Sequence, residues 1–225
     1  MAYIAEISDL KKYYGNRLVL DIPRLTFAPA RRYALIGTNG SGKTTLLRIL
    51  AGILPPDEGE VIINSPTSGY MPQKPYAFNY SVLKNVSMAV KNDPQKEKTA
   101  LAALEKVGLA HMAANRGNSL SGGETQRMAF ARILAQENKL ILLDEPTAAA
   151  DIAAEKMLTA ALREHLENTG STLIFSTHTP ALALDLADEI IFMEKGRALE
   201  SGAAKDLMYS PKTAEASQFL AHWRI

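Results

Sequence analysis

The segment from Gly37 to Thr44 has the residue types and spacing of a loop that binds phosphate groups. It reads Gly-Thr-Asn-Gly-Ser-Gly-Lys-Thr and matches the pattern G-x-x-x-x-G-K-[ST]. Its glycines let the backbone turn tightly, so successive N–H groups can face a phosphate, and the following helix adds the positive end of its dipole. Lys43 can reach the terminal phosphates, and the Thr44 hydroxyl can bind Mg²⁺. The alternative is a glycine-rich turn without a ligand.

A second candidate lies where the apolar run 140–143 ends in two carboxylates, Asp144 and Glu145. Neighbouring side chains of a strand point to opposite sides, so the two carboxylates can have different roles. Asp144, at the strand end, is placed to hold Mg²⁺ through water. Glu145 is then free to act as a general base on an attacking water. The alternative is an acidic helix cap, and the upstream phosphate loop argues against it.

A third candidate is the segment that begins at Ser121. Ser121 and Glu124 have the spacing of a capping box, which predicts the start of a helix. The capping box does not explain Gly122 and Gly123, since a glycine costs about 1 kcal/mol relative to alanine in a helix interior. Bare glycine backbone at a helix N-terminus lets a phosphate approach closely. The segment therefore predicts both a helix start and a surface that faces an anion.

The elements that must position these residues are typical of an α/β protein. Short apolar runs predict buried strands of a parallel sheet at 33–37, 140–144, 172–177 and 189–193. Helical patterns occupy 43–51, 123–136, 152–167 and 179–186. Residues 1–28 and 58–72 alternate and predict an antiparallel sheet beside the parallel core. The stretch 74–138 is predicted to be a mostly helical insertion, with an amphipathic helix at 95–107.

Composition narrows the class of protein further. The 225 residues fit one large domain or two small ones, and 47% hydrophobic residues can bury a sizeable core. The balance of 25 basic against 24 acidic residues argues against a broad nucleic-acid surface, so no nucleic-acid partner is expected. The absence of cysteine excludes disulfides, zinc ribbons and thiol catalysis. We expect no signal peptide, because the start of the chain has no apolar core behind a basic head. We also expect no membrane span, because no apolar window approaches 18 residues.

In their order along nearly the whole chain, these motifs resemble those of the ATP-binding subunits of ABC transporters. Residues 37–44 resemble the Walker A motif, and 140–146 resemble Walker B with its glutamate. Residues 120–127, LSGGETQR, resemble the family's signature, and Ser121 lies 23 residues before Asp144, as the family requires. The signature is the most specific of these matches.

Single residues complete the resemblance. Gln73 resembles the Q-loop glutamine, and His178 resembles the switch histidine. Asp151 resembles the D-loop aspartate, although this chain has AAAD where SALD is commoner. Tyr14 resembles the aromatic residue that stacks on adenine, and the adjacent Tyr13 could take its place.

The resemblance implies a fold and a set of site residues. We expect an α/β fold with a P-loop NTPase core and a mostly parallel sheet, an N-terminal antiparallel β subdomain and a helical ABC-type subdomain. Residues 1–225 would form a single ABC ATPase domain, with core and β subdomain at about 1–73 and 139–225 and the helical subdomain at about 74–138. The implied catalytic residues are Glu145, His178, Lys43 and Gln73, and the implied Mg²⁺ residues are Thr44, Gln73 and Asp144. ATP would be bound by Tyr14, Gly37, Thr38, Asn39, Gly40, Ser41, Gly42, Lys43, Thr44, Thr45, Ser121, Gly122, Gly123, Glu124 and Asp151.

The resemblance also implies partners. The family works as a head-to-tail dimer, here of identical chains or with a paralogous subunit, with ATP between one phosphate loop and the other signature. A separate transmembrane permease would dock near Tyr76, Phe78 and Tyr80, which otherwise would fill the core of the helical subdomain. The chain would lie peripherally at the cytoplasmic face of the membrane.

The function implied is that of a Mg²⁺-dependent ATPase that drives solute uptake. The compact length and the stretch 73–86 are somewhat similar to subunits for inorganic anions such as tungstate, molybdate or phosphate. We expect no regulatory domain after the core. The alternative is a short membrane-associated ABC ATPase that is not involved in import, of the lipoprotein-extraction or cell-division type.

Overall fold

The computed structural model describes residues 3–91 and 93–223, which form two compact units. Of the described residues, the first unit comprises 3–68, 139–145 and 171–223, and the second comprises 69–91, 93–138 and 146–170. Each unit is described by itself below. In the described part of the chain, no helix is both long and apolar enough to cross a lipid bilayer.

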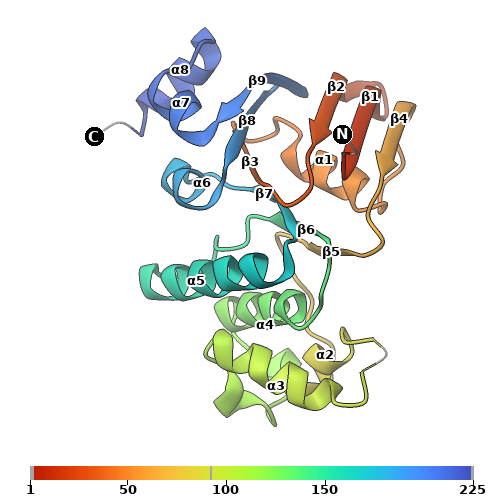
Figure 1. The fold of residues 1–225 in the computed structure, drawn as a ribbon, viewed down its shortest axis with the longest axis vertical. Coiled ribbons are helices and arrows are strands. Elements are labelled where there is room, and N and C mark those ends of the chain that lie inside the picture. Colours follow the sequence, from red (N-terminus) through yellow and green to blue (C-terminus); the bar gives the residue numbers. More distant parts are fainter. Residues whose placement is uncertain (1–2, 92, 224–225) are drawn as a thin grey trace. The chain divides into compact units, whose positions relative to one another are not determined.

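The first unit contains a mainly parallel sheet in the order β6-β7-β3-β8-β9. Its strands are β3 (Arg32–Gly37), β6 (Leu140–Asp144), β7 (Thr172–Ser176), β8 (Glu189–Glu194) and β9 (Arg197–Ala203). The first four run parallel, and β9 returns antiparallel to β8 (Figure 1). Every residue of β6 and β7 is buried, as expected for parallel strands that are covered on both faces. The four predicted strands are therefore confirmed.

The helices of the first unit pack on this sheet. They are α1 (Lys43–Leu50), α6 (Pro180–Leu186), α7 (Ala204–Tyr209) and α8 (Ala214–Ala221). Helix α1 contacts β3, β6 and β7 through its buried leucine and isoleucine side chains. The sequence predicted α1 and α6, but β9, α7 and α8 had no prediction. The turn residues Lys195 and Gly196 were the signal that a hairpin follows β8.

A second, antiparallel sheet in the first unit has the order β2-β1-β4 (Figure 1). Its strands are β1 (Ala5–Tyr14), β2 (Arg17–Phe27) and β4 (Glu58–Ile63). The prediction of an antiparallel sheet is confirmed for these strands but was too long at its end. Residues 68–71 form a separate strand, β5 (Ser68–Met71), outside this sheet, because the chain turns at Pro66 and Thr67.

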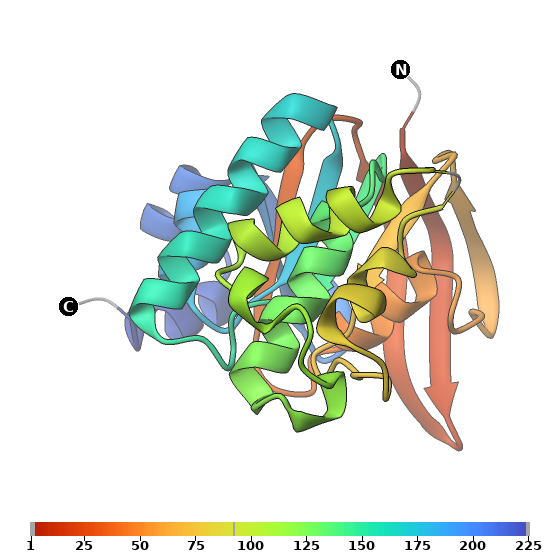
Figure 2. The same cartoon turned by 90° about the horizontal axis from the view of Figure 1, so that it is seen from below.

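The second unit is mostly helical. It contains α2 (Val82–Ser87), α3 (Lys96–Lys106), α4 (Gly122–Leu134) and α5 (Ile152–Thr169), with 3₁₀ turns at Ala110–Met112 and Gly117–Ser119. Helices α2, α3 and α4 pack on one another, and α5 packs on α3 and α4 (Figure 2). An ion pair joins Lys106 of α3 to Glu164 of α5 at 2.8 Å. These contacts group residues 146–170 with the helical unit, although the sequence analysis placed them with the core.

Candidate nucleotide site

The phosphate loop follows β3 and leads into α1. Gly42 is the N-cap of α1 and has a φ of 105°, in the left-handed region that favours glycine. A Cβ at Gly42 would also overlap the side chain of Leu20. The glycine at this position is therefore required both by the backbone conformation and by the close approach of β2.

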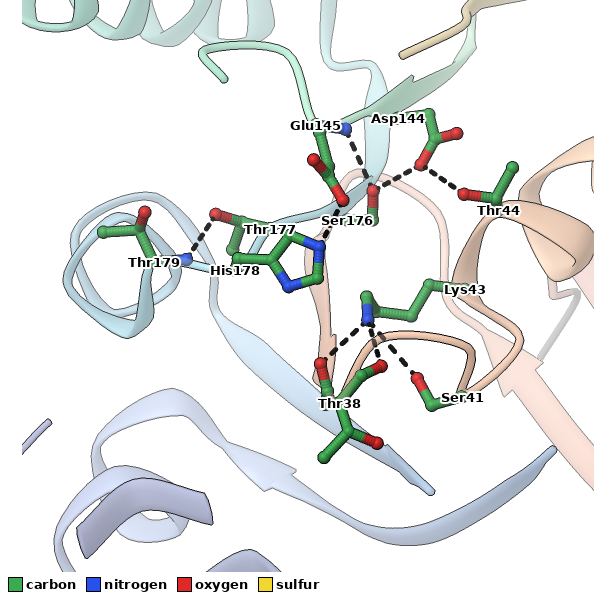
Figure 3. Close-up of polar contacts among 11 residues, drawn as sticks. Thr38, Ser41, Lys43, Thr44, Asp144, Glu145, Ser176, Thr177, His178 and Thr179 are labelled. Atoms are coloured by element: carbon green, nitrogen blue, oxygen red, sulfur yellow. Dashed lines mark hydrogen bonds and ion pairs between the residues drawn. The ribbon is translucent and has the colours of Figure 1, made fainter. Parts of the chain in front are cut away.

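Lys43 folds back over the loop that precedes it (Figure 3). Its Nζ donates hydrogen bonds to the carbonyl oxygens of Gly37 at 2.8 Å and Thr38 at 3.0 Å, and to the Ser41 hydroxyl at 3.3 Å. Burial lowers the pKa of Lys43, and the nearby carboxylates, of which Glu145 has the largest effect, oppose that shift. A buried ammonium group is thus held by the oxygens of the loop.

Asp144, at the end of β6, has one oxygen that is fully engaged. Its Oδ1 accepts hydrogen bonds from the Thr44 hydroxyl at 3.1 Å and the Ser176 hydroxyl at 2.7 Å. The other oxygen, Oδ2, is buried and has no hydrogen-bond partner among the described residues. A buried carboxylate oxygen without a partner is costly unless a cation or water satisfies it. The carboxylate of Asp144 and the hydroxyl of Thr44 are both oxygen donors that suit Mg²⁺.

Glu145 has an unusual backbone conformation. Its φ is 49°, in the left-handed region, and its N–H donates to the Ser176 hydroxyl at 2.9 Å. Its carboxylate contacts His178 Nε2 (Figure 3), and the Glu145 side chain is only 12% exposed. From the sequence, Glu145 is the carboxylate expected to act as a general base on water. In the structure, the Ser176 hydroxyl holds its backbone N–H and His178 contacts its carboxylate, so the side chain has a defined direction.

Ser176 is a site residue that the sequence analysis missed. It is fully buried at the end of β7 and lies opposite Asp144 in the parallel register. Its hydroxyl accepts from the Glu145 N–H and donates to Asp144, so one oxygen holds the Glu145 backbone and the Asp144 carboxylate. The sequence predicted both strands but not their pairing or register, so nothing in it marked Ser176 as the residue opposite Asp144.

The hairpin between β8 and β9 supports the phosphate loop from outside. The N–H of Gly196 donates to the Ser41 carbonyl at 3.0 Å, and the Gly196 carbonyl accepts from the Asp21 N–H at 2.9 Å. A Cβ at Gly196 would overlap the carbonyl of Val19. The tip of this hairpin therefore connects the phosphate loop with β2, and only glycine fits there.

Tyr14 and Tyr13 have different surroundings. The Tyr13 hydroxyl donates to Glu58 at 3.2 Å, and its N–H donates to Asp57 at 2.6 Å. Tyr14, the last residue of β1, is 49% exposed. Of the two residues, Tyr14 is the more exposed.

The signature segment lies in the second unit and forms the predicted capping box. Ser121 is the N-cap of α4, and the Glu124 N–H donates to its hydroxyl at 3.3 Å. The Glu124 carboxylate accepts from both the N–H and the hydroxyl of Ser121 at 2.7 Å, and the backbone hydrogen bond lowers the pKa of Glu124. A Cβ at Gly122 would meet open space, so the backbone of the first turn is accessible there.

Other predicted residues of the second unit lie on loops and helix ends. Asp151 is the N-cap of α5 and accepts from the Ala154 N–H at 2.8 Å. Gln126, on α4, accepts from the Ala149 N–H at 2.9 Å, so a side chain of the signature helix holds the segment before Asp151. Gln73 is exposed and follows β5. The first unit thus gathers the phosphate loop, Asp144, Glu145 and His178, while the second joins the signature helix to the Asp151 segment.

Comparison with known proteins identifies relatives of this chain. A model of the ABC transporter family matches residues 20–148. The chain is 34% identical to the sulfate/thiosulfate import ATP-binding protein CysA of Nitrosomonas europaea, over 96% of this chain and 65% of that protein. It is 35% identical to the Fe(3+) ions import ATP-binding protein FbpC of Pseudomonas fluorescens, over 96% of this chain and 66% of that protein. The chain therefore spans slightly less than two thirds of the length of both relatives.

Solved structures share the fold. One is a metal-chelate type ABC transporter in an inward-facing conformation, with a TM-score of 0.81, 31% identity, and 98% of this chain and 90% of that chain covered. Another is cbiO1 from Clostridium perfringens, part of the ABC transporter complex cbiONQ, with a TM-score of 0.79, 27% identity, and 93% and 92% of the two chains covered. The family model covers more than half of the chain and includes the phosphate loop, the signature and the acidic strand, so the chain belongs to the ABC transporter family.

Proposed function

We propose that this chain is the ATP-hydrolysing subunit that drives an ABC importer through a separate permease. The observation that carries the proposal is the arrangement around Ser176. There the Ser176 hydroxyl contacts the Asp144 carboxylate, which suits a metal ion, and the backbone of Glu145. His178 contacts the Glu145 carboxylate, and all of these residues belong to the unit that contains the phosphate loop. The two relatives described above are both named as import proteins, which favours uptake over lipoprotein extraction or cell division.

Different residues of the site would take different roles in ATP hydrolysis. The N–H groups of the phosphate loop would bind the phosphates, and Lys43 would exchange its bonds to loop oxygens for phosphate oxygens. Glu145 would accept the proton of the attacking water, and its pairing with His178 would keep the carboxylate directed. His178, 38% exposed on its side chain, would also reach the terminal phosphate.

Thr44 and Asp144 would hold Mg²⁺, with Gln73 as the further ligand that the family resemblance implies. The unpartnered Oδ2 of Asp144 supports this assignment. Among the residues that the structure describes, no three His, Cys, Asp or Glu side chains form a metal site by themselves. That fits Mg²⁺, which is usually held by one or two protein groups together with water and substrate phosphates. The ion would neutralise charge on the phosphates.

The chain would act as a head-to-tail dimer, in which each signature completes the partner's nucleotide site. The accessible first turn of α4 at Gly122 supports this part of the proposal. Tyr14 would stack on adenine, and Asp151 would lie near the dimer interface. The chain would lie peripherally on the membrane, with the permease docked near Tyr76, Phe78 and Tyr80.

The transported solute is proposed only as a class. The relatives are named for sulfate or thiosulfate and for Fe(3+), so we propose an inorganic ion rather than tungstate, molybdate or phosphate in particular. The function is tested by reconstituting the chain with its permease in vesicles and measuring ATP-dependent uptake. The chain with Glu145→Gln is the control, because it should bind ATP without driving uptake. Equal uptake with the variant would refute the proposal.

A further inference from the structure

Residues 146–150 join Glu145 to Asp151, and we call them the linking segment. Three of them, 148–150, are alanines. An alanine side chain forms no hydrogen bonds, so this part of the segment can be held by hydrogen bonds only through its backbone. Ala148 and Ala149 are also exposed, so burial does not fix them either. The position of the linking segment therefore depends on what its backbone groups contact.

A buried side chain of α4 provides such a contact. Gln126 lies about one turn after Gly122 in this helix and is 3% exposed. Its Oε1 accepts a hydrogen bond from the Ala149 N–H at 2.9 Å. A buried side chain is closely packed by its neighbours, so its oxygen offers the acceptor at one fixed place. Helix α4 therefore holds the linking segment at Ala149.

The carbonyl of Ala149 also lies against α4. A Cβ added at Gly123 would be 3.2 Å from the Ala149 carbonyl oxygen, which is closer than side-chain carbons usually approach a neighbour. A Cβ added at Gly122 would meet nothing within 4 Å. The two glycines therefore differ, because Gly122 leaves open space while Gly123 makes room for the linking segment. Both the N–H and the carbonyl of Ala149 are thus placed by the start of α4.

Further hydrogen bonds join the linking segment to itself and to α5, which packs on α4 (Figure 2). The Thr147 hydroxyl donates to the Glu155 carboxylate of α5 at 3.1 Å, and the Thr147 carbonyl accepts from the Ala150 N–H at 2.9 Å. Asp151, which follows the segment, caps α5. These bonds do not involve Gln126. A change at Gln126 should therefore release the segment from α4 and leave α5 and its N-cap in place.

We propose that Gln126 is a positioning residue for ATP hydrolysis, because it fixes the segment that follows Glu145 to the helix that carries the signature. This inference rests on the proposed function, in which Glu145 is the general base. The Ser176 hydroxyl holds the backbone N–H of Glu145, and Gln126 holds the chain that leaves Glu145 on the other side. A movement of the signature helix is therefore passed to the segment between Glu145 and Asp151.

The alternative role of Gln126 is to stabilise the helical unit alone. A buried polar side chain that accepts from a backbone N–H can stabilise a fold without any effect on a reaction. Replacing a purely stabilising residue lowers the free energy of unfolding and leaves the rate of hydrolysis unchanged. Replacing a positioning residue lowers the rate as well, and it frees the backbone group that the residue held.

The test replaces Gln126 by leucine, which has a similar volume and no acceptor. Hydrogen exchange of individual backbone amides is followed by NMR on the full chain without nucleotide. The Ala149 amide should exchange at least about fivefold faster in Gln126→Leu, while amides in the middle of α5 keep their rates. The kcat for ATP should fall about tenfold. The affinity of the single chain for a non-hydrolysable ATP analogue, measured by calorimetry, should stay within about twofold, because the change acts on the reaction geometry.

The matched control is Thr159→Val. Thr159 lies on α5 and is 7% exposed, and its hydroxyl donates to the Glu155 carbonyl at 2.8 Å. The variant removes a buried hydroxyl from the same unit and leaves Gln126 and Ala149 unchanged, so it should keep both the Ala149 exchange rate and kcat. An unchanged Ala149 exchange rate in Gln126→Leu, a wild-type kcat in that variant, or the same fall in kcat in both variants would overturn the inference.

A second pair of variants tests the contact even if Gln126→Leu does not fold. Gly123→Ala should displace the Ala149 carbonyl and speed the exchange of the Ala149 amide, whereas Gly122→Ala adds the same methyl group in open space and should not. Equal Ala149 exchange in these two variants would overturn the inference. ATP hydrolysis by the unchanged chain is measured in parallel. Its absence would refute the proposed function itself, whereas the outcomes above refute the inference while the unchanged chain still hydrolyses ATP.

Discussion

Replacing Ser176 by alanine should damage both the stability and the catalytic geometry of the nucleotide site. The substitution removes a single hydroxyl from a fully buried position and adds no bulk. That hydroxyl holds the Glu145 N–H at 2.9 Å and the Asp144 carboxylate at 2.7 Å. A change of one atom therefore releases two neighbouring residues that we assign to the chemistry.

The expected loss of stability depends on which polar groups lose a hydrogen bond when the Ser176 hydroxyl is removed. A buried polar group that loses its hydrogen bond costs about 1–3 kcal/mol. Asp144 Oδ1 keeps its bond from Thr44, so the larger loss falls on the Glu145 N–H. Glu145 also has a strained left-handed φ of 49°, which the Ser176 bond helps to maintain. We expect Ser176→Ala to lower the free energy of unfolding by about 2–3 kcal/mol.

The catalytic effect should appear in kcat more than in KM. A displacement of about 1 Å at a reacting group can cost on the order of a hundredfold in rate. Ser176→Ala should therefore lower kcat by roughly tenfold to a hundredfold. The KM for ATP should change little, because Lys43 and the phosphate loop make no contact with this hydroxyl in the hydrogen bonds described above.

Phosphate release measured against ATP concentration, together with urea unfolding, would test both expectations. The matched control is Thr177→Ala. Thr177 is also buried, but its hydroxyl accepts from the Thr179 N–H at 3.0 Å and not from the carboxylate residues. It should lower stability while keeping most of kcat. Wild-type kcat in Ser176→Ala, or the same loss of kcat in both variants, would refute the reasoning.

The remaining predictions concern the base, the phosphate loop, the signature and a buried histidine. The Glu145→Gln variant should bind ATP, hydrolyse it about 10²–10⁴-fold more slowly and accumulate as a dimer on gel filtration with ATP. A wild-type rate of hydrolysis would show that Glu145 is not the general base. Lys43→Ala should lower both the affinity for ATP and the rate of hydrolysis, while Ser121→Arg should keep ATP binding by the single chain and block dimer formation. Calorimetry measures the affinity, and gel filtration measures the dimer. Equal losses of affinity in the two variants would contradict a signature that acts on the partner's site. Burial lowers the pKa of His165, whose Nε2 has no hydrogen-bond partner among the described residues. The folded protein therefore binds a proton at His165 less readily than the unfolded chain does. The free energy of unfolding should be independent of this group above the unfolded pKa of about 6.5 and fall as the pH drops below it, by at most about 1.4 kcal/mol per pH unit. Urea unfolding between neutral and acidic pH measures this slope, and His165→Gln should reduce it; an equal slope in the variant would contradict the assignment.

Residues that act within a local segment could be predicted from the sequence. The capping box of Ser121 and Glu124 and the strand that ends at Asp144 depend on spacing over a few residues, and the structure contains both. The contact between Arg132 and Asn85 had no such signal. The two residues are 47 positions apart along the chain, and the packing of α2 on α4 brings them together.

The role of Ser176 and the backbone conformation of Glu145 could not be predicted from the sequence either. Ser176 contacts Asp144 across a strand pair, although the two residues are 32 positions apart in the chain. A sequence can predict both strands without giving their register, and the register decides which polar residue lies opposite the carboxylate. The left-handed φ of Glu145 was also outside local prediction, because this conformation is rare for residues other than glycine.

The hairpin between β8 and β9 has a practical consequence for anyone who modifies this protein. A short exposed turn between two strands is ordinarily a good place to insert an affinity tag, a fluorescent reporter or a circular-permutation break. Here Gly196 is buried, and its backbone bonds both Ser41 and Asp21. An insertion between Lys195 and Gly196 would pull that backbone away from the phosphate loop. Its effect would be a loss of nucleotide affinity in a folded protein, and a screen of random insertions should show this turn as intolerant although it lies far along the chain from residues 37–44.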